Sequence, residues 1–394
     1  MAFTEEVYKS RRIVLVRFVR ARTGRPTYTY PDLDDRGWLH DPAAANGETP
    51  ALVHGPVFGM AQDKEVVIKL ERLRLEEAAS GGPDLFVKSE DETIASIVEP
   101  ANNAELPADG TFRIKGGTGS WRDKFCKLTV HVGSESGPII GECGVRVFQR
   151  RTVRVHPWLL NLRGRTAPGG PITAGTCATT QANITTLFRT VNRIWRSCGI
   201  YFHVDAADTS GSVNMVGNPG ELTENSGGAA ITHPNGNAFP AGTDDSNGVH
   251  RNNRRANRCN IWWVRRIRDL TPGAGTTMAW AMDNTTDSGG VNQSGIVMTD
   301  AADANDLAHE LGHYLSLDHS DEPAAGSGSR SRNDIQVLRR LMYRFNPHGR
   351  TGYRRNVGYG SGLRGALITM RDKPKHFRDD EWFEARRRAI RGAY

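Results

Sequence analysis

The residue types with the clearest chemical potential gather between Asp303 and His319, in the run DANDLAHELGHYLSLDH. His309 and His313 are four residues apart, so on a helix they share one face, one turn apart. The opposite face of that helix would be apolar and would anchor it in a core through Leu307, Leu311, Tyr314 and Leu315. The spacing therefore predicts two imidazoles that bind one ion from a fixed helix.

Glu310 completes the pattern H-E-x-x-H, in which two histidines bind zinc and the carboxylate acts as general base toward a water molecule. His319 follows His309 by ten residues, which is the spacing of the extended pattern with a third histidine ligand. Three neutral nitrogen ligands with an open fourth position describe a catalytic zinc site. We therefore predict one catalytic zinc ion on His309, His313 and His319. An exposed polar helix face is the alternative for H-E-x-x-H alone.

These residues resemble the motif of the metzincin clan of zinc endopeptidases, and of its matrixin and reprolysin members in particular. Met342, in the phrase RLMY, is similar to the methionine turn that lies beneath the metal in that clan. Tyr343 would then contribute hydrogen bonds to the substrate or the metal site. The sequence departs from the clan at Ser316, where the pattern has glycine. The resemblance implies that Glu310 activates water for hydrolysis of a peptide bond.

The resemblance extends upstream through GTTMAWA and GIVMTD to the helix. In the related families the first of these segments is an edge strand that pairs with the backbone of the substrate, which is a general way to hold an extended peptide. Substrate-binding residues would then be Thr277, Met278, Ala279 and Trp280. An ordinary internal strand is the alternative for this segment.

The elements that must position the site begin after residue 155. Apolar residues at helical spacing predict a helix over 182–198, with Thr179 or Thr180 as N-cap and Gly199 as its end. Strands are predicted at 199–204, 259–264, 276–281 and 295–299, whereas no regular structure is assigned to 205–260. The fold expected for residues 156–394 is α+β, a metzincin-like zinc protease domain with a twisted mixed sheet and an active-site helix.

Residues 1–155 read as a separate all-β domain of sandwich type that precedes the catalytic domain. Short β-branched runs at 12–19, 64–70, 111–115, 127–132 and 144–155 are separated by turn-forming residues. Residues 71–79 are expected to form one short helix. No catalytic residue types concentrate in this domain, and its sequence indicates no ligand or partner.

Composition narrows the function classes. Apolar residues make up 38% and charged residues 24% of the chain, which is typical of globular proteins. The net charge of +7 falls wholly in residues 156–394, because residues 1–155 carry 22 basic and 22 acidic side chains. Arginine clusters at 251–268 and 386–391 leave nucleic acid open as a partner, but a solvated surface is favoured.

No apolar stretch is long enough to span a membrane, and the first residues show no apolar signal segment. Export by a signal-independent route is therefore the favoured localisation, and the cytoplasm is the alternative. The aspartates at 283, 287, 300, 303 and 306 do not follow the spacing of an EF-hand, so Ca²⁺ has no support beyond their number. Cys126 and Cys143 are the one pair considered for a disulfide. Cys143 is more simply a buried structural cysteine than a latency switch for the metal.

The favoured function is that of a zinc-dependent endopeptidase that cleaves protein or peptide substrates, in the form of an exported bacterial effector. Two alternatives remain: an intracellular protease that works near nucleic acid, and a non-catalytic binding protein whose zinc is structural.

Overall fold

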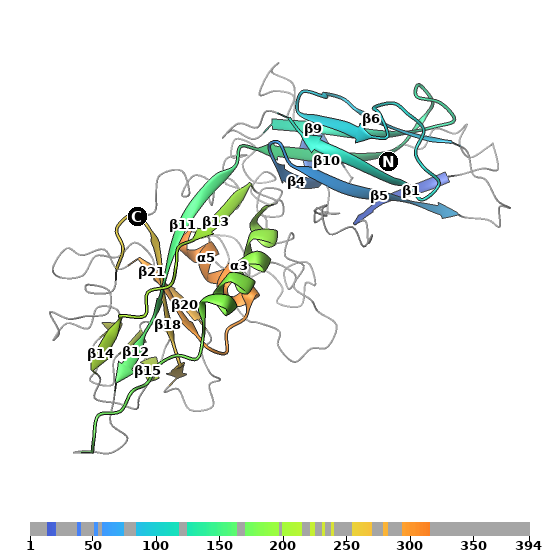
Figure 1. Cartoon of the computed structure of the whole chain (residues 1–394). Coiled ribbons are helices and arrows are strands. Elements are labelled where there is room, and N and C mark those ends of the chain that lie inside the picture. The colour runs from blue at the N-terminus through green and yellow to red at the C-terminus, as the bar shows by residue number, and fades with distance from the viewer. Residues whose placement is uncertain are drawn as a thin grey trace. The chain divides into compact units, whose positions relative to one another are not determined.

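The computed structural model describes fourteen stretches of the chain. They are 14–20, 38–40, 51–53, 57–74, 84–117, 124–163, 170–196, 199–214, 221–224, 231–232, 238–239, 254–269, 279–282 and 294–315. The chain divides into two compact units, which meet in sequence between Arg150 and Arg151. A short stretch, 195–200, is grouped with the first unit. Figure 1 shows the helices and strands of both units.

Apart from the stretch 195–200, the first unit is built from strands alone among the residues that the structure describes. One sheet has the order β1-β5-β8-β7, with all neighbours antiparallel. The other has the order β4-β10-β9-β6, in which β4 and β10 are parallel and the remaining pairs antiparallel. The bounds are β1 Val14–Arg20, β4 Val57–Ala61, β5 Glu65–Arg74, β6 Leu85–Ser89, β7 Ala95–Glu99, β8 Thr111–Gly116, β9 Lys124–Val132 and β10 Ile139–Phe148. A separate pair joins β2 Trp38–His40 to β3 Ala51–Val53.

Alternation along the strands gives this unit one core. In β8, Phe112 and Ile114 are buried while their neighbours are more exposed. The core cluster takes such residues from both sheets, for example Ile68 from one and Val130 from the other. Because a two-residue period sends alternate side chains to opposite faces, each sheet contributes one apolar face to the shared core.

Two sequence expectations for the first unit are wrong in detail. Residues 71–74, expected to begin a helix, belong to β5, where they pair with β1 and where Glu71 forms an ion pair with Arg17 at 2.8 Å. The pairing partner lies more than fifty residues away, so cross-strand contacts override the local helical preference of the run. Residues 144–155, expected as one strand, form parts of β10 and of β11 Arg151–Leu159, with a break at 149–150.

The second unit begins with β11, which crosses the predicted domain boundary at 155/156. A helix, α3 Gln181–Trp195, follows, with Thr180 as its N-cap. The Thr180 hydroxyl accepts a hydrogen bond from Asn183 N (3.3 Å), and the Asn183 side chain accepts one from Thr180 N (3.0 Å). α3 ends at Trp195, three residues before the end predicted from the sequence. Gly199, the predicted stop, has φ of +70°, which suits glycine, and β13 Ile200–Val204 follows it.

Five strands form the central sheet of this unit, in the order β13-β11-β18-β21-β20. The new bounds are β18 Cys259–Val264, β20 Ala279–Met282 and β21 Gly295–Thr299. β18 runs parallel to β11 on one side and to β21 on the other, and β20 pairs antiparallel with β21. The strands predicted at 199–204, 259–264 and 295–299 are thus found, and the sheet is mixed, as expected. Of the strand predicted at 276–281, residues 279–281 belong to β20, and 276–278 lie outside the described residues.

Aromatic and aliphatic residues cover one face of this sheet. They form a cluster made of Trp158, Leu160, Leu162, Trp262, Val264, Ile267 and Val297, with Trp280 packed against it. Trp263 alternates with these residues along β18 and contributes instead to the face that carries α3, because it lines a cavity together with α3 residues. The two faces of the sheet therefore have different neighbours.

Short strands occur where no regular structure was assigned from the sequence. β12 Asn161–Arg163 pairs with β14 Ser212–Asn214, and a small sheet has the order β17-β16-β15-β19. Its strands are β15 Glu221–Glu224, β16 Ile231–Thr232, β17 Ala238–Phe239 and β19 Arg266–Asp269. Such brief strands have little periodicity, so their partners reveal them rather than their composition. No helix among the described residues is long and apolar enough to cross a membrane.

Candidate metal centre

The helix that carries the two histidines is α5, Ala304–Tyr314. It begins at Asp303, whose side chain accepts hydrogen bonds from Asn305 N (2.7 Å) and Asp306 N (3.0 Å). Asp306 returns the interaction, because its carboxylate accepts a hydrogen bond from Asp303 N at 2.9 Å. This capping box satisfies N–H groups that have no partner inside a helix, and its negative charges suit the helix N-terminus.

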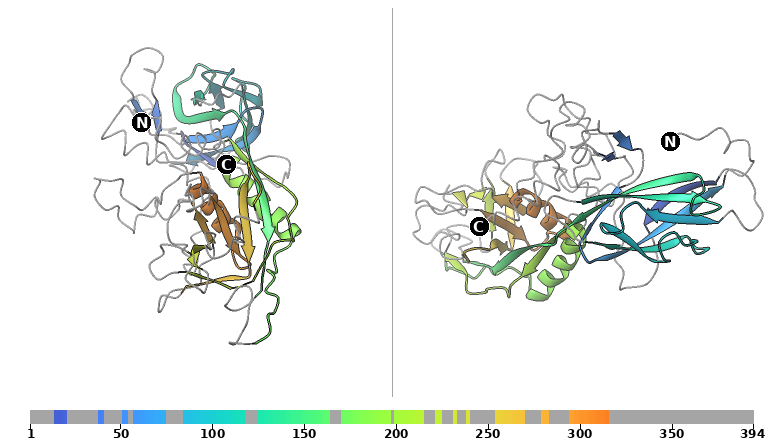
Figure 2. Two further views of the ribbon diagram at one scale, coloured as in Figure 1. Left: turned by 90° about the vertical axis from the view of Figure 1, so that its left-hand side faces the viewer. Right: turned by 90° about the horizontal axis from the view of Figure 1, so that it is seen from above.

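The predicted apolar face of α5 is buried. Leu307, Leu311 and Leu315 have no exposed surface, and Tyr314 is 3% exposed. The helix contacts β20 and β21, beside which it lies in both views of Figure 2. The burial fixes the rotation of α5 about its axis and therefore the direction in which the other face points.

His309 and His313 meet on that other face. Their Nε2 atoms are 3.1 Å apart, and their ring centroids lie 4.7 Å apart with the rings nearly perpendicular, at 87°. Two nitrogen ligands of a tetrahedral zinc ion, each about 2.0–2.1 Å from it, would be about 3.3 Å apart. The pair therefore fits one zinc ion, and the same separation lets one neutral imidazole donate to the other when no metal is bound. Glu310, next to His309 on the helix, is half-buried.

Several predicted site residues lie outside the described residues: His319, Met342, Tyr343, Thr277 and Met278. For this reason the structure brings together two of the three predicted ligands. In the part of the chain that it describes, no group of three metal-binding side chains gathers.

The other two predicted substrate-binding residues lie in β20, the edge strand of the central sheet as described. Ala279 pairs with Met298 and Trp280 with Val297 in neighbouring β21. Trp280 packs against the aromatic and aliphatic cluster on one face of the sheet. One backbone edge of β20 has no described strand beside it.

Asp300 is a residue whose role sequence reasoning missed. It follows β21 directly, and its carboxylate accepts hydrogen bonds from Ala178 N (2.7 Å), Thr179 N (2.9 Å) and the Thr179 hydroxyl (2.8 Å). The sequence placed Asp300 with Asp303 and Asp306 among aspartates that could bind calcium. In the structure, Asp303 and Asp306 form local hydrogen bonds at the start of α5, whereas Asp300 bonds residues before α3. The D-x-x-D spacing before an apolar run signals the capping box, but no sequence signal joins Asp300 to a threonine 121 residues away.

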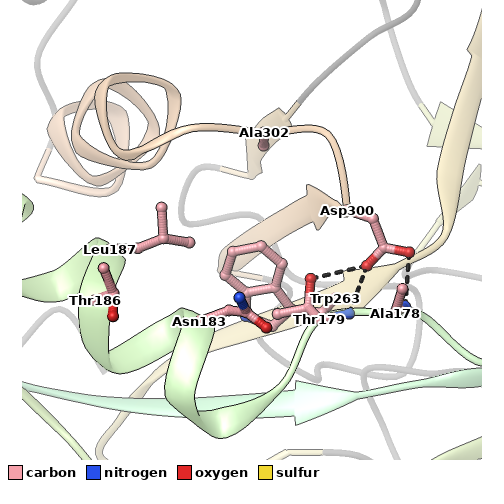
Figure 3. A pocket seen from close by; sticks show the side chains of 8 residues that line it. All are labelled: Ala178, Thr179, Asn183, Thr186, Leu187, Trp263, Asp300 and Ala302. Atoms are coloured by element: carbon pink, nitrogen blue, oxygen red, sulfur yellow. Dashed lines mark hydrogen bonds between the residues drawn. The ribbon is translucent and has the colours of Figure 1, made fainter.

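A cavity of about 330 Å³ lies beside Asp300 (Figure 3). Its walls come from the start of α3, from β18 and from the connection between β21 and α5. The lining residues are Ala178, Thr179, Asn183, Thr186, Leu187, Trp263, Asp300 and Ala302.

The cysteines do not provide a reactive thiol among the described residues. Cys126, Cys143, Cys177 and Cys259 form no disulfide, so the bridge considered for the first two is absent. Cys143 is fully buried in β10, and burial raises the pKa of its thiol well above the usual value. Because the thiolate is the form that binds a metal, this environment supports the structural interpretation of Cys143.

The arginine cluster at 251–268 is partly neutralised. Arg258 donates from Nε to Asp205 at 2.7 Å, and Arg255 lies 3.5 Å from Asp208. These ion pairs lower the charge that the segment can offer to a nucleic acid, in line with the favoured interpretation of a solvated surface.

The comparison with known families bears on the same region. The model of metallo-peptidase family M12, Reprolysin_5, matches residues 169–345. This span includes α3, the strands β13, β18, β20 and β21, and α5, together with His319 and Met342. Neither a curated protein nor a solved structure gives a significant match to this chain. The motif and the family match agree, and residues 169–345 are thus similar to the metzincin-type metallopeptidase catalytic domains of family M12.

Proposed function

We propose that this metallopeptidase is a zinc-dependent endopeptidase with Glu310 as its general base. The observation that carries the proposal is the approach of His309 Nε2 to His313 Nε2, 3.1 Å, on a helix whose opposite face is buried. His319 is the third ligand in this proposal, and Met342 forms the turn beneath the metal. The catalytic domain would have the fold of the metzincin clan. The two sheets of the first unit would form a sandwich around their shared core.

When bound, zinc would supply an acidified water and polarise the carbonyl of the peptide bond. The chain's own residues do the rest. His309 and His313, held by the buried face of α5, keep two coordination positions fixed. Glu310 accepts the proton of the attacking water and passes it to the leaving amine, so that the proton ends on the new amino group. The backbone edge of β20 that has no described strand beside it would hold the substrate as an added strand, as in other cases of strand addition.

Substitution of Glu310 tests the catalytic assignment. Zinc content and cleavage of a diverse peptide library would be measured for the wild type and for Glu310→Ala. We expect the variant to keep its zinc and to lose turnover by at least about a thousandfold, since a general base and the water that it orients are both affected. His203→Gln, an exposed histidine in the same unit, is the matched control and should keep both properties.

Each alternative predicts a different result. A Glu310→Ala protein that cleaves as well as the wild type would refute the role of Glu310. A zinc-loaded wild type that cleaves no member of the library would favour the non-catalytic zinc protein. Cleavage that requires added DNA would favour the protease that works near nucleic acid.

Export by a signal-independent route stays a prediction of the sequence. Fractionation of the source cells into cytoplasm and medium, with a cytoplasmic marker as control, tests it. Recovery of the protein with that marker alone would contradict export.

A further inference from the structure

The catalytic helix is reached through a short connection. Residues 300–303 lie between the last residue of β21, Thr299, and the first residue of α5, Ala304. A turn within the connection is closed by a hydrogen bond from Ala302 N to Thr299 O at 3.1 Å. The direction in which α5 leaves the sheet therefore depends on how this connection is held.

Asp300 joins the connection to the entry of α3. Its three hydrogen bonds reach Ala178 and Thr179, directly before Thr180, the N-cap of α3. Hydrogen bonds to a charged acceptor are stronger than neutral ones, and a carboxylate near a helix N-terminus is further stabilised by the helix dipole. One carboxylate thus holds together the beginnings of both helices.

Beside Asp300, side chains do not fill the space between the start of α3 and the connection to α5. About 330 Å³ of space lies between the first turns of α3 and the connection, bordered by Leu187 on α3 and by Ala302 on the connection (Figure 3). At this place side chains leave space, so the hydrogen bonds of Asp300 join the connection to the start of α3.

We propose that Asp300 is a positioning residue of the peptidase, which holds the entry of α5 against α3. It thereby sets the distance of His309, His313 and Glu310 from the edge strand β20. The activity part of this inference rests on the proposed function, whereas the structural part does not. Because both histidines belong to one helix, they move together when the connection shifts. Loss of the Asp300 contacts should therefore affect turnover more than affinity for zinc.

The test compares Asp300→Ala with Asp208→Ala. Asp208 is a matched control, since its carboxylate also accepts hydrogen bonds from a backbone N–H (2.8 Å) and a hydroxyl (2.6 Å), both of Ser210, in a loop of the same unit. In the zinc-free protein, Asp300→Ala should speed the amide hydrogen exchange of Ala178 and Thr179 by about tenfold or more. With zinc, kcat should fall about tenfold or more with KM and zinc affinity within about threefold, since small misplacements of catalytic groups cost this much. Asp208→Ala should change neither the amide exchange of Ala178 and Thr179 nor kcat.

A substitution that fills the cavity provides a second test of the inference. Ala302→Leu adds apolar volume where the space lies, so packing should replace the hydrogen bonds. The double variant Asp300→Ala/Ala302→Leu should regain most of the lost kcat, whereas Ala302→Leu alone should stay near the wild type. If Asp300→Ala does not fold, Thr179→Val removes only the hydroxyl contact, and Thr179→Ser should restore it.

Unchanged exchange at Ala178 and Thr179, or a kcat loss no larger than in Asp208→Ala, would overturn the inference. A double variant with no recovery would also overturn the role given to the cavity. If the wild type cleaves no peptide, the proposed function fails, but faster exchange in Asp300→Ala would still support the structural part.

Discussion

Asn260 organises the loop that leads into β18. It has no exposed surface, and its side chain accepts hydrogen bonds from Trp158 Nε1 (3.1 Å) and Arg255 N (2.8 Å). Its amide group donates to the carbonyl oxygens of Arg255 (3.0 Å) and Arg258 (3.1 Å). One side chain thus satisfies four polar groups at the start of a central strand.

Replacement of Asn260 by leucine should lower the free energy of unfolding by about 2–3 kcal/mol, because the N–H of Trp158 and three backbone groups lose their partner. Urea denaturation of the zinc-free protein at neutral pH measures this. A loss below about 0.5 kcal/mol would mean that water replaces these contacts without cost.

His156 predicts a pH dependence of stability. It is buried, its ring lies 4.9 Å from that of Trp158, and its Nδ1 is 3.8 Å from Asp205. Burial lowers the pKa of His156, and the charge of Arg255 adds to this, against the opposite effect of Asp205 and Asp208. The folded state therefore binds a proton less readily than the unfolded state. Stability should fall as the pH drops through the unfolded pKa of about 6.5, toward the lower folded pKa.

The His156→Gln variant isolates this contribution. The wild type should lose more stability than the variant between pH 7.5 and pH 5.5, with a difference in slope of at most about 1.4 kcal/mol per pH unit, the limit for one proton. Urea midpoints in the presence of a chelator provide the comparison. Parallel slopes for the two proteins would contradict a lowered pKa.

The capping box of α5 is expected to contribute to the stability of the helix. Asp303→Ala removes the acceptor for Asn305 N and Asp306 N, and should cost about 1 kcal/mol of unfolding free energy. Asp303→Ser should restore most of this, because serine is also a good N-cap. The measurement is chemical denaturation of the zinc-free variants. Equal stabilities of the alanine and serine variants would show that the cap contributes little.

Elements with strong local signals could be predicted from the sequence, and those that depend on distant partners could not. α3 and α5 have apolar residues at helical spacing, so both were predicted as helices, and the apolar face of α5 was predicted too, for example Leu307, which is fully buried. Residues 71–74 have a helical composition, yet β1 recruits them into a sheet. The ion pair of Glu71 with Arg17 depends on residues that only the fold brings together.

The candidate site follows the same rule. The spacing of His309 and His313 predicted their convergence, because four residues on a helix determine it. The Asp300 contacts span the distance from β21 to α3 and depend on the parallel sheet that aligns these elements. No local pattern carries that information.

The whole chain consists of two units with separate cores, and this has a thermodynamic consequence. Ile114 is fully buried in the core of the first unit. Ile114→Ala should destabilise that unit by about 2–5 kcal/mol, through lost burial and the cavity left behind. Affinity for zinc, whose proposed ligands lie in the second unit, should stay unchanged.

Differential scanning calorimetry with and without zinc tests this. We expect two transitions, of which Ile114→Ala lowers one and zinc raises the other. A single transition that responds to both changes would contradict the independence of the two units.

The central claim is that His309, His313 and His319 bind a single zinc ion with one position left to water. X-ray absorption at the zinc edge of the loaded protein measures this most directly, with zinc content determined for the wild type, His309→Gln and His319→Gln. We expect three nitrogen ligands and one oxygen at about 2.0–2.1 Å, and a loss of zinc in both variants. Retention of zinc in either variant, or a zinc shell without three nitrogens, would contradict the account.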